Sequence, residues 1–162
     1  MTVQYRVASE DDLPSICALG EEVNALHHNA WPYIFAGPGA AVRDRAWWAQ
    51  SIGQEGSTTL VAESQGKLIA FVTVSVHDET NSLFRPSRYA RVGSVSVTRD
   101  ERGKGIGRKV MALAEQWALN RGAKDMRLTV WAFNEHALHV YSELGFVQRS
   151  INFGKQLAEP DA

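Results

Sequence analysis

The sequence predicts a single α/β domain, in which β-like runs and amphipathic helical segments follow one another along 162 residues. Two observations support this prediction. Short apolar runs bounded by turn residues indicate strands, and apolar residues spaced three and four apart indicate helices between them. No internal repeat, low-complexity tract or linker divides the chain, and its length suits one core. We therefore expect one domain over residues 1–162, with residues 155–162 fraying.

The N-terminal part shows a strand and two helices. Residues 3–7 form a β-like run, and Ser9 followed by Asp12 is typical of a helix start, with a capping hydroxyl and an acidic residue three positions later. The helical pattern after them ends before Pro32. A second helix is expected over residues 41–53.

The rest of the chain predicts a series of strands and helices. Gly66 marks a tight turn between two strands, and Gly122 is suited to end a helix. The expected elements are strands at 58–63, 67–77 and 89–97, a helix ending near 121, a strand at 124–131, a helix at 134–144 and one or two closing strands within 146–154.

Composition excludes several classes of protein. The formal net charge is −1, with 44% hydrophobic and 22% charged residues, so no broad basic face for nucleic acid is expected. The single cysteine, Cys17, cannot form an internal disulfide and is expected to be buried. Residues 1–6 lack a signal-peptide core, and the longest apolar-rich run, 68–76, is too short to cross a bilayer. We expect a cytoplasmic protein that binds neither membrane nor nucleic acid.

A glycine-rich basic turn lies between the strand at 89–97 and the helix after it. Its pattern is Arg102, Gly105 and Gly107, with further cations at Lys104 and Arg108. Unpaired amides at a helix start carry partial positive charge, and glycines let a phosphate approach the backbone. The spacing fits neither the dinucleotide fingerprint nor the P-loop. Taken alone, this motif fits a phosphate-binding turn and a plain basic surface turn about equally well. A second motif is needed to decide between them.

That second motif lies downstream, where Asn134, Ala137, Tyr141 and Gly145 follow a β-like run. The first three are spaced by three and four, so they share one helix face. Each residue also has a purely structural interpretation, as a helix cap, a core side chain or a helix stop. The two motifs in this order resemble those of the GNAT superfamily of N-acetyltransferases.

The resemblance covers roughly residues 58–154, and it implies a fold and a cofactor. The fold is a mixed, mostly antiparallel twisted sheet flanked by about four helices, with strands four and five splayed to admit acetyl-CoA. The residues that it implies for cofactor binding are Val95, Ser96, Val97, Arg102, Gly103, Lys104, Gly105, Ile106, Gly107, Arg108, Asn134 and Ala137. Tyr141 is the expected catalytic residue, a general acid that protonates the departing thiolate.

The chain departs from the family pattern in the fourth strand. Many relatives carry a glutamate there that deprotonates the amine, whereas this chain has none at residues 92–95. The candidates for a base are Glu21, Glu22, His27, His28, His77 and Asp78, and the alternative is that water removes the proton without a single base. The aromatic loop 27–35 is either an acceptor pocket or a set of core anchors. His136 and His139 are expected at the surface, and no metal site is expected.

The leading hypothesis is an N-acetyltransferase that acts on a primary amine of a small molecule or peptide, as a monomer or homodimer. A non-catalytic CoA-binding or sensory domain is the alternative. The missing glutamate favours that alternative weakly, and the presence of Asn134 and Tyr141 argues against it. A nucleic-acid-binding module lacks the broad basic surface that it needs.

Overall fold

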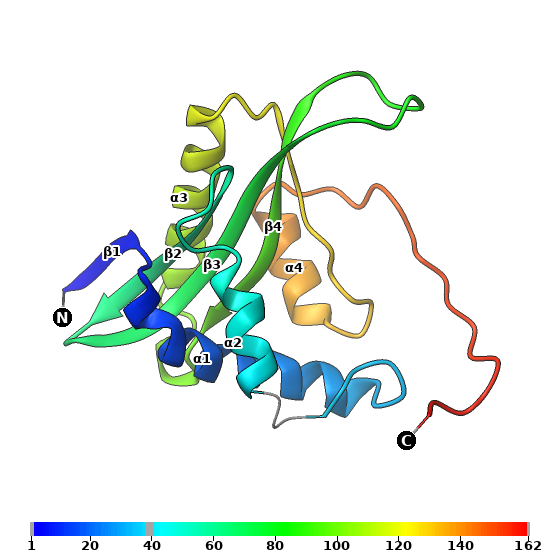
Figure 1. The fold of residues 1–162 in the computed structure, drawn as a ribbon, viewed down its shortest axis with the longest axis horizontal. Helices are drawn as coiled ribbons and strands as arrows, with labels where there is room; N and C mark the ends of the chain where they lie inside the picture. Colours follow the sequence, from blue (N-terminus) through cyan, green and yellow to red (C-terminus); the bar gives the residue numbers. More distant parts are fainter. Residues whose placement is uncertain (1, 38–40, 162) are drawn as a thin grey trace.

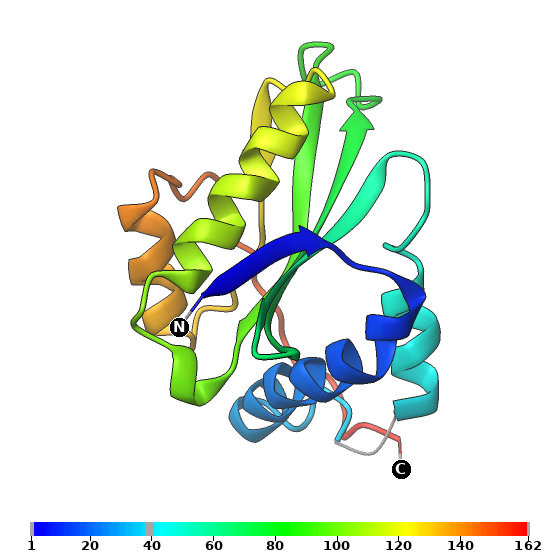
Figure 2. The ribbon, with the colours of Figure 1, turned by 90° about the vertical axis from the view of Figure 1, so that its left-hand side faces the viewer.

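The computed structural model describes residues 2–37 and 41–161, with the side chains of residues 41–43 left aside. A five-stranded sheet runs diagonally through the molecule, with helices on both faces (Figures 1 and 2). Its elements in chain order are β1 Val3–Val7, η1 Glu10–Asp12, α1 Leu13–Ala30, α2 Ala41–Ala49, β2 Ser57–Ser64, β3 Lys67–Asp78, β4 Arg88–Val97, η2 Arg99–Glu101, α3 Ile106–Asn120, β5 Asp125–Arg127 and α4 Glu135–Glu143.

The strands lie in the order β1-β2-β3-β4-β5, and all neighbours are antiparallel except β4 and β5, which are parallel. Successive strand residues point to opposite faces, so the buried central strands contribute side chains to a hydrophobic core on each face of the sheet. Leu60 and Ala62 of β2 pack in the core beneath α3, whereas Val61 between them packs with Phe71 beneath α1 and α2. The mixed α/β fold expected from the sequence is confirmed.

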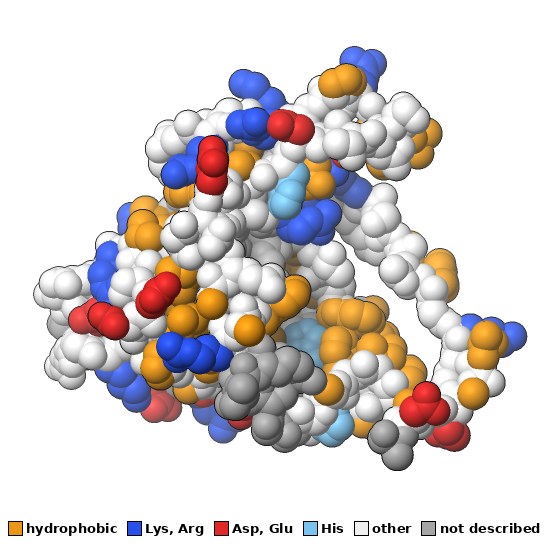
Figure 3. Space-filling model, in the orientation of Figure 1, with side chains coloured by type: hydrophobic (Ala, Val, Ile, Leu, Met, Phe, Trp, Pro, Cys, Tyr) orange, Lys and Arg blue, Asp and Glu red, His pale blue; other side chains and the backbone are white. Residues whose placement is uncertain are grey.

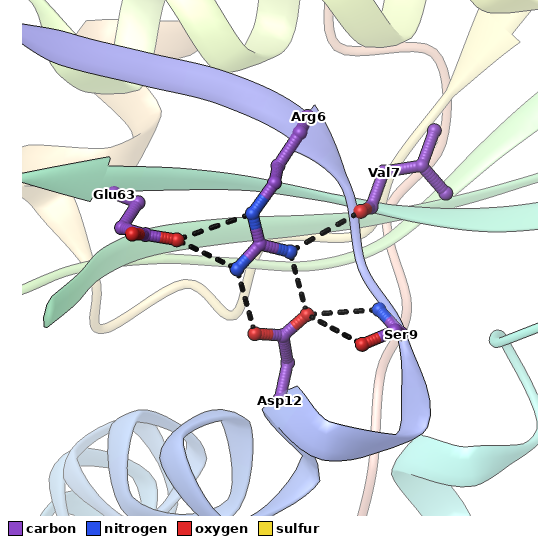
Figure 4. Close-up of polar contacts among 5 residues, drawn as sticks. All are labelled: Arg6, Val7, Ser9, Asp12 and Glu63. Carbon is purple, nitrogen blue, oxygen red and sulfur yellow. Dashed lines mark hydrogen bonds and ion pairs between the residues drawn. The ribbon is translucent and has the colours of Figure 1, made fainter. Parts of the chain in front are cut away.

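The start of α1 is tied to the sheet by Arg6 of β1 (Figure 4). Its guanidinium donates to both oxygens of Asp12 at 2.7 and 2.9 Å, and to Glu63 of β2 at 2.7 and 3.1 Å. Asp12 also accepts from the backbone N–H of Ser9 at 2.8 Å, which completes the expected capping box. Hydrogen bonding to Arg6 lowers the pKa of Asp12, so this junction stays charged at neutral pH.

Helices α1 and α2 meet through a small residue and a large one. A Cβ placed on Gly20 would lie 2.7 Å from the ring of Trp48, so only glycine permits this approach. Cys17, one turn earlier on α1, is buried, and this burial raises the pKa of its thiol. The inert buried thiol expected from the sequence is what the fold provides.

Three expectations differ from the structure. The second helix ends at Ala49 instead of residue 53, and β5 has three residues instead of eight. Residues 146–154, expected to form closing strands, are extended but belong to no strand. The last prediction is wrong because no strand among the described residues forms backbone hydrogen bonds with residues 147–154, although their sequence alternates as a strand does. Among the described residues, no helix is long and apolar enough to cross a membrane.

Candidate active site

The glycine turn places a helix start beside the end of β4. Gly103 and Gly105 have φ of 77° and 82°, values that side-chain-bearing residues rarely adopt, and Gly105 is the N-cap of α3. The first intrahelical bond of this region runs from the N–H of Lys109 to the carbonyl of Gly105 at 3.0 Å. The amides of residues 106–108 therefore face outward from the helix start, as an anion site requires.

Two arginines of the turn are already paired with carboxylates on other elements. Arg102 contacts Glu22 of α1 at 3.5 Å and donates from Nε to the carbonyl of Val97 at 2.9 Å. Arg108 pairs with Glu143 of α4. All four charged side chains are about half exposed, so each pair contributes little to stability. The two pairs join the turn to α1 and to α4.

Strand β4 is bulged where it turns away from β5. Val72 pairs with Val95 and Val74 with Val92, so two residues of β4 oppose Thr73 alone. The Thr73 hydroxyl accepts from the N–H of Ser94 at 2.9 Å, and a Cβ on Gly93 would lie only 2.6 Å from that oxygen. The sequence analysis missed this feature, because nothing in the local pattern of β4 indicates a partner twenty residues earlier.

A cleft of about 1080 Å³ opens between the separating strands. β4 pairs with β5 only through residues 89–91, and beyond them residues 92–97 and 128–131 line the two sides of the cleft. The predicted site residues that line it are Val95, Ser96, Val97, Arg102, Gly103, Gly105, Gly107, Arg108, Asn134, Ala137 and Tyr141. Lys104 instead pairs with Glu101 at 3.1 Å, and Ile106 is buried in the core.

Tyr141 lies on α4 with its ring packed edge-on against Phe146, at 5.7 Å between centroids. Burial raises the pKa of its phenol, so the hydroxyl stays protonated at neutral pH and keeps a proton to donate. Asn134 caps α4 by accepting from the N–H of Ala137 at 3.1 Å. The structural interpretation of Asn134 is therefore observed, and it also places this residue at the cleft.

Two of the six base candidates line the cleft, Glu22 and His27. The Nδ1 of His27 lies 2.7 Å from the carbonyl of Val23, which can only accept a hydrogen bond, so Nδ1 carries the hydrogen. In the neutral imidazole, Nε2 is then the nitrogen with the lone pair. The other four do not line the cleft. Glu21 precedes Glu22 on α1, His28 bonds to the Phe35 carbonyl, His77 bonds to Ser75, and Asp78 pairs with Arg88.

The aromatic loop after α1 supports the cleft wall from behind. Trp31 and Phe35 contact Trp131 edge-on at 5.6 and 4.7 Å, and Phe35 also contacts His27 at 5.0 Å. Trp131 and His27 line the cleft, whereas Trp31 and Phe35 do not. Of the two interpretations of this loop, the structure thus favours anchors that position the wall. His136, expected at the surface, is exposed and borders the cleft.

Comparison with known proteins agrees with this geometry. A family model described as "Acetyltransferase (GNAT) family" matches residues 21–146, which is 126 of the 162 residues. A mycothiol acetyltransferase from Jonesia denitrificans is 31% identical over 62% of this chain and 30% of its own length. A streptothricin acetyltransferase from Streptomyces lavendulae is 31% identical over 60% of this chain and 48% of its own. The chain thus spans less than half the length of these two relatives.

Solved structures match over nearly the whole chain. A mutant of the BH1408 protein from Bacillus halodurans superposes with a TM-score of 0.88 at 20% identity, covering 98% of this chain and 100% of the other. Aminoglycoside N-acetyltransferase AAC(6')-Iy in complex with CoA gives a TM-score of 0.74 at 17% identity, over 97% and 96% of the two chains. At these identities the likeness concerns the fold.

Proposed function

The chain belongs to the acetyltransferase (GNAT) family, and from this premise we propose that it transfers the acetyl group of acetyl-CoA to a primary amine of a small molecule or peptide. The observation that carries the proposal is the single cleft that unites the turn at residues 102–108, the end of β4 and Tyr141. Phosphate binding at the turn would position acetyl-CoA, and a proton donor beside its thioester would assist departure of the thiolate.

The pyrophosphate of CoA would bind the outward amides of residues 106–108, with Arg102 and Arg108 exchanging their carboxylate partners for phosphate oxygens. The amide-rich pantetheine arm would then lie along residues 95–97 of β4. There the exposed backbone groups of a strand end pair with it as an added strand does. The thioester is thereby delivered to the part of the cleft that Tyr141 borders.

The reaction needs one base and one acid. We assign the base to His27, whose Nε2 takes a proton from the ammonium group of the acceptor. The freed amine attacks the thioester carbonyl carbon, and the C–N bond forms while the C–S bond breaks. The departing thiolate takes the proton of the Tyr141 hydroxyl, and the second proton that the amine nitrogen loses on becoming an amide passes through solvent to the Tyr141 oxygen and restores its hydroxyl. The products are the acetylamide and CoA with a free thiol, and the amine proton on His27 returns to solvent.

Binding and chemistry are tested separately with the purified chain. Calorimetric titration with CoA is expected to show one site, and mixing acetyl-CoA with a panel of polyamines, aminoglycosides, amino acids and peptides is expected to release thiol only when an acceptor is present. CoA binding with no thiol release above the hydrolysis rate across the panel would instead support a non-catalytic CoA-binding domain. Absence of CoA binding would contradict the proposal.

The role of His27 has a matched control in its neighbour His28, which bonds to the Phe35 carbonyl and does not line the cleft. With an active acceptor, His27→Gln should lower kcat/KM by about 10²-fold and remove the acidic limb of its pH profile. His28→Gln should leave both unchanged. Equal losses in both variants, or an intact acidic limb in His27→Gln, would show that the proton goes elsewhere.

A further inference from the structure

One face of the sheet is uncovered at the end of β3 and the start of β4. Every second residue of this stretch packs in the core beneath α3, namely Val74, Val76, Ala90 and Val92. The residues between them therefore face the other side of the sheet. Phe71, earlier on β3, packs on that side beneath α1 and α2, whereas His77, Arg91 and Gly93 are exposed. In Figure 1 both strands extend past α1 and α2 at this end, which leaves their outward side chains open to a ligand.

Four polar side chains meet on this uncovered face. The pairing of β3 with β4 places Ser75 opposite Arg91 and His77 opposite Tyr89. The Ser75 hydroxyl lies 2.7 Å from Nε2 of His77, and the imidazole ring stacks on the Tyr89 ring at 5.5 Å between centroids. Figure 3 shows basic side chains, a histidine among them, gathered over this part of the sheet. The face is thus built of contacting groups around one aromatic ring.

Two arginines lie against the Tyr89 ring, and they differ in their partners. The guanidinium carbon of Arg127 is 3.8 Å from the ring centroid, and that of Arg91 is 6.0 Å from it. Arg127 pairs with Glu79 at 2.9 Å and with Asp125 at 3.0 Å. Arg91 is exposed and pairs with no carboxylate in the part of the chain that the structure describes. The positive charge of Arg91 is therefore open to an anionic ligand.

Arg91 lies where the cleft begins. It is the last residue of β4 that pairs with β5, opposite Arg127, and the strands separate directly beyond this pair. Gly93, two residues later, lines the cleft, and a Cβ on it would point to Thr73 on the uncovered face. Two strand residues span about 7 Å. A small molecule with two polar groups a few bonds apart can therefore reach both Arg91 and the cleft.

The carboxylates that line the cleft lie at its other end. Among the described residues they are Glu22 and Glu101, which contact basic side chains of the turn expected to bind the CoA phosphates. The two carboxylates nearest to Arg91 are the ones that Arg127 holds. A polycationic acceptor would need carboxylates around its amines, whereas the charge available at this end of the cleft is positive.

We propose that Arg91 binds an anionic group of the acceptor, so that the acceptor is an amine that also carries a carboxylate or a phosphate, such as an amino acid or an aminoalkyl phosphate. This inference rests on the proposed function, because it concerns the acceptor of that reaction. The planar guanidinium can donate two parallel hydrogen bonds to either anion. The amine of the same molecule enters the cleft past Gly93. Arg91 thus selects the acceptor without touching the reacting atoms.

The test compares acceptors in pairs that differ in the anionic group alone. Thiol release is measured for amino acids against their own carboxamides, and for aminoalkyl phosphates against the corresponding amino alcohols. We expect kcat/KM to be at least tenfold higher for the anionic member, and the two series show whether carboxylate or phosphate is preferred. Removing the anion also makes the ammonium group easier to deprotonate. Amine basicity alone would therefore give the opposite preference.

Arg91→Gln should raise KM for the anionic acceptor about tenfold or more and leave kcat and the affinity for CoA unchanged, because only a binding contact is lost. The matched control is Arg85→Gln, which removes the same charge from an exposed position in the loop between β3 and β4, outside the cleft. It should keep the preference. Equal rates for the members of each pair, an unchanged preference in Arg91→Gln, or the same loss in Arg85→Gln would overturn the inference and leave the proposed function standing.

Binding is measured separately, so that the inference is tested even without turnover. The chain is titrated calorimetrically, in the presence of CoA, with the same pairs of compounds. Absence of thiol release from the whole panel contradicts the proposed function alone. Tighter binding of the anionic member, lost in Arg91→Gln and kept in Arg85→Gln, would still support an anion subsite at Arg91. Equal binding of both members, or no binding of the anionic one, would overturn it.

Discussion

At the scale of single residues, the site depends on a few side chains whose chemical state is set by their surroundings. Burial raises the pKa of Tyr141, and the Val23 carbonyl holds the hydrogen of His27 on Nδ1. Tyr141 thus keeps a proton to donate at neutral pH, and the neutral form of His27 has its acceptor nitrogen at Nε2.

Replacing Tyr141 by Phe removes the hydroxyl and keeps the ring against Phe146. We expect turnover to fall by about 10²-fold or more with CoA affinity retained, because only protonation of the leaving thiolate is lost. Steady-state kinetics and calorimetry measure the two effects. Tyr33→Phe, at an exposed position outside the cleft, is the control. Turnover within twofold of the parent would assign the proton donor to another group.

Gly93 and Thr73 together determine how the bulge in β4 packs against β3. Gly93→Ala places a Cβ against the Thr73 hydroxyl, so it should lower the free energy of unfolding by about 1–3 kcal/mol. In a Thr73→Ala background the same change should cost less, because the opposing oxygen is gone. Denaturant unfolding of the four proteins gives this coupling. Gly154→Ala, which meets no atom within 4 Å, is the control. Additive effects would mean that Thr73 does not occupy the bulge.

At the scale of elements, the turn between β4 and α3 is the segment that we expect to bind the pyrophosphate of CoA. Gly105→Asp adds a negative charge at the expected pyrophosphate and should weaken CoA binding at least tenfold, about 1.4 kcal/mol or more. Gly122→Asp is a close control: its φ is also positive, at 83°, and it also has open space, but it ends α3 away from the cleft. Equal affinity of both variants in calorimetry would remove the site from this turn.

The sequence predicted elements whose causes are local. Ser9 with Asp12, Gly66 and Gly122 mark boundaries that the structure has within a residue or two, since capping and turn geometry depend on near neighbours. The bulge in β4 was not predictable, because Thr73 that fills it belongs to another strand. The closing strands expected within residues 146–154 were not formed, because a strand also needs a partner, and no strand among the described residues pairs with this segment.

In the candidate site, too, some features follow from local sequence and others depend on residues that are distant in the sequence. Most of the predicted site residues line the cleft, whereas the choice among six base candidates needed the fold, which places Glu22 and His27 at the cleft and His77 against Tyr89. Lys104 and Ile106 share the turn with the lining residues but point to Glu101 and to the core. Consecutive residues of a turn face different ways, and no pattern of residue types predicts which.

At the scale of the whole molecule, one charged network joins β5, the loop after β3 and Arg149, which follows α4. Asp125 accepts from Arg127 at 3.0 Å and from Arg149 at 2.8 Å, and Arg127 also pairs with Glu79 at 2.9 Å. Hydrogen bonding to Arg149, the largest cause, lowers the pKa of Asp125 from 3.8 to about 2.

The depressed pKa of Asp125 sets the direction of a pH effect. Its contribution to stability is fully present above about pH 4 and is lost as the pH falls through about 2, because protonation is easier in the unfolded chain. Asp125→Asn should reduce the loss of stability between these values, as followed by denaturant unfolding at each pH. Asp161→Asn, in the exposed end of the chain, is the control. An identical pH slope in the parent and Asp125→Asn would exclude this network.

The buried thiol of Cys17 decides how cleanly this protein can be assayed. A thiol reagent reports the product CoA by its absorbance, and any accessible protein thiol adds a background signal. The chain has one cysteine, it lies on the buried face of α1, and its raised pKa keeps it out of the reactive thiolate form. Product can thus be followed continuously at high protein concentration, and a cysteine introduced on the surface would be the single reactive position for a dye.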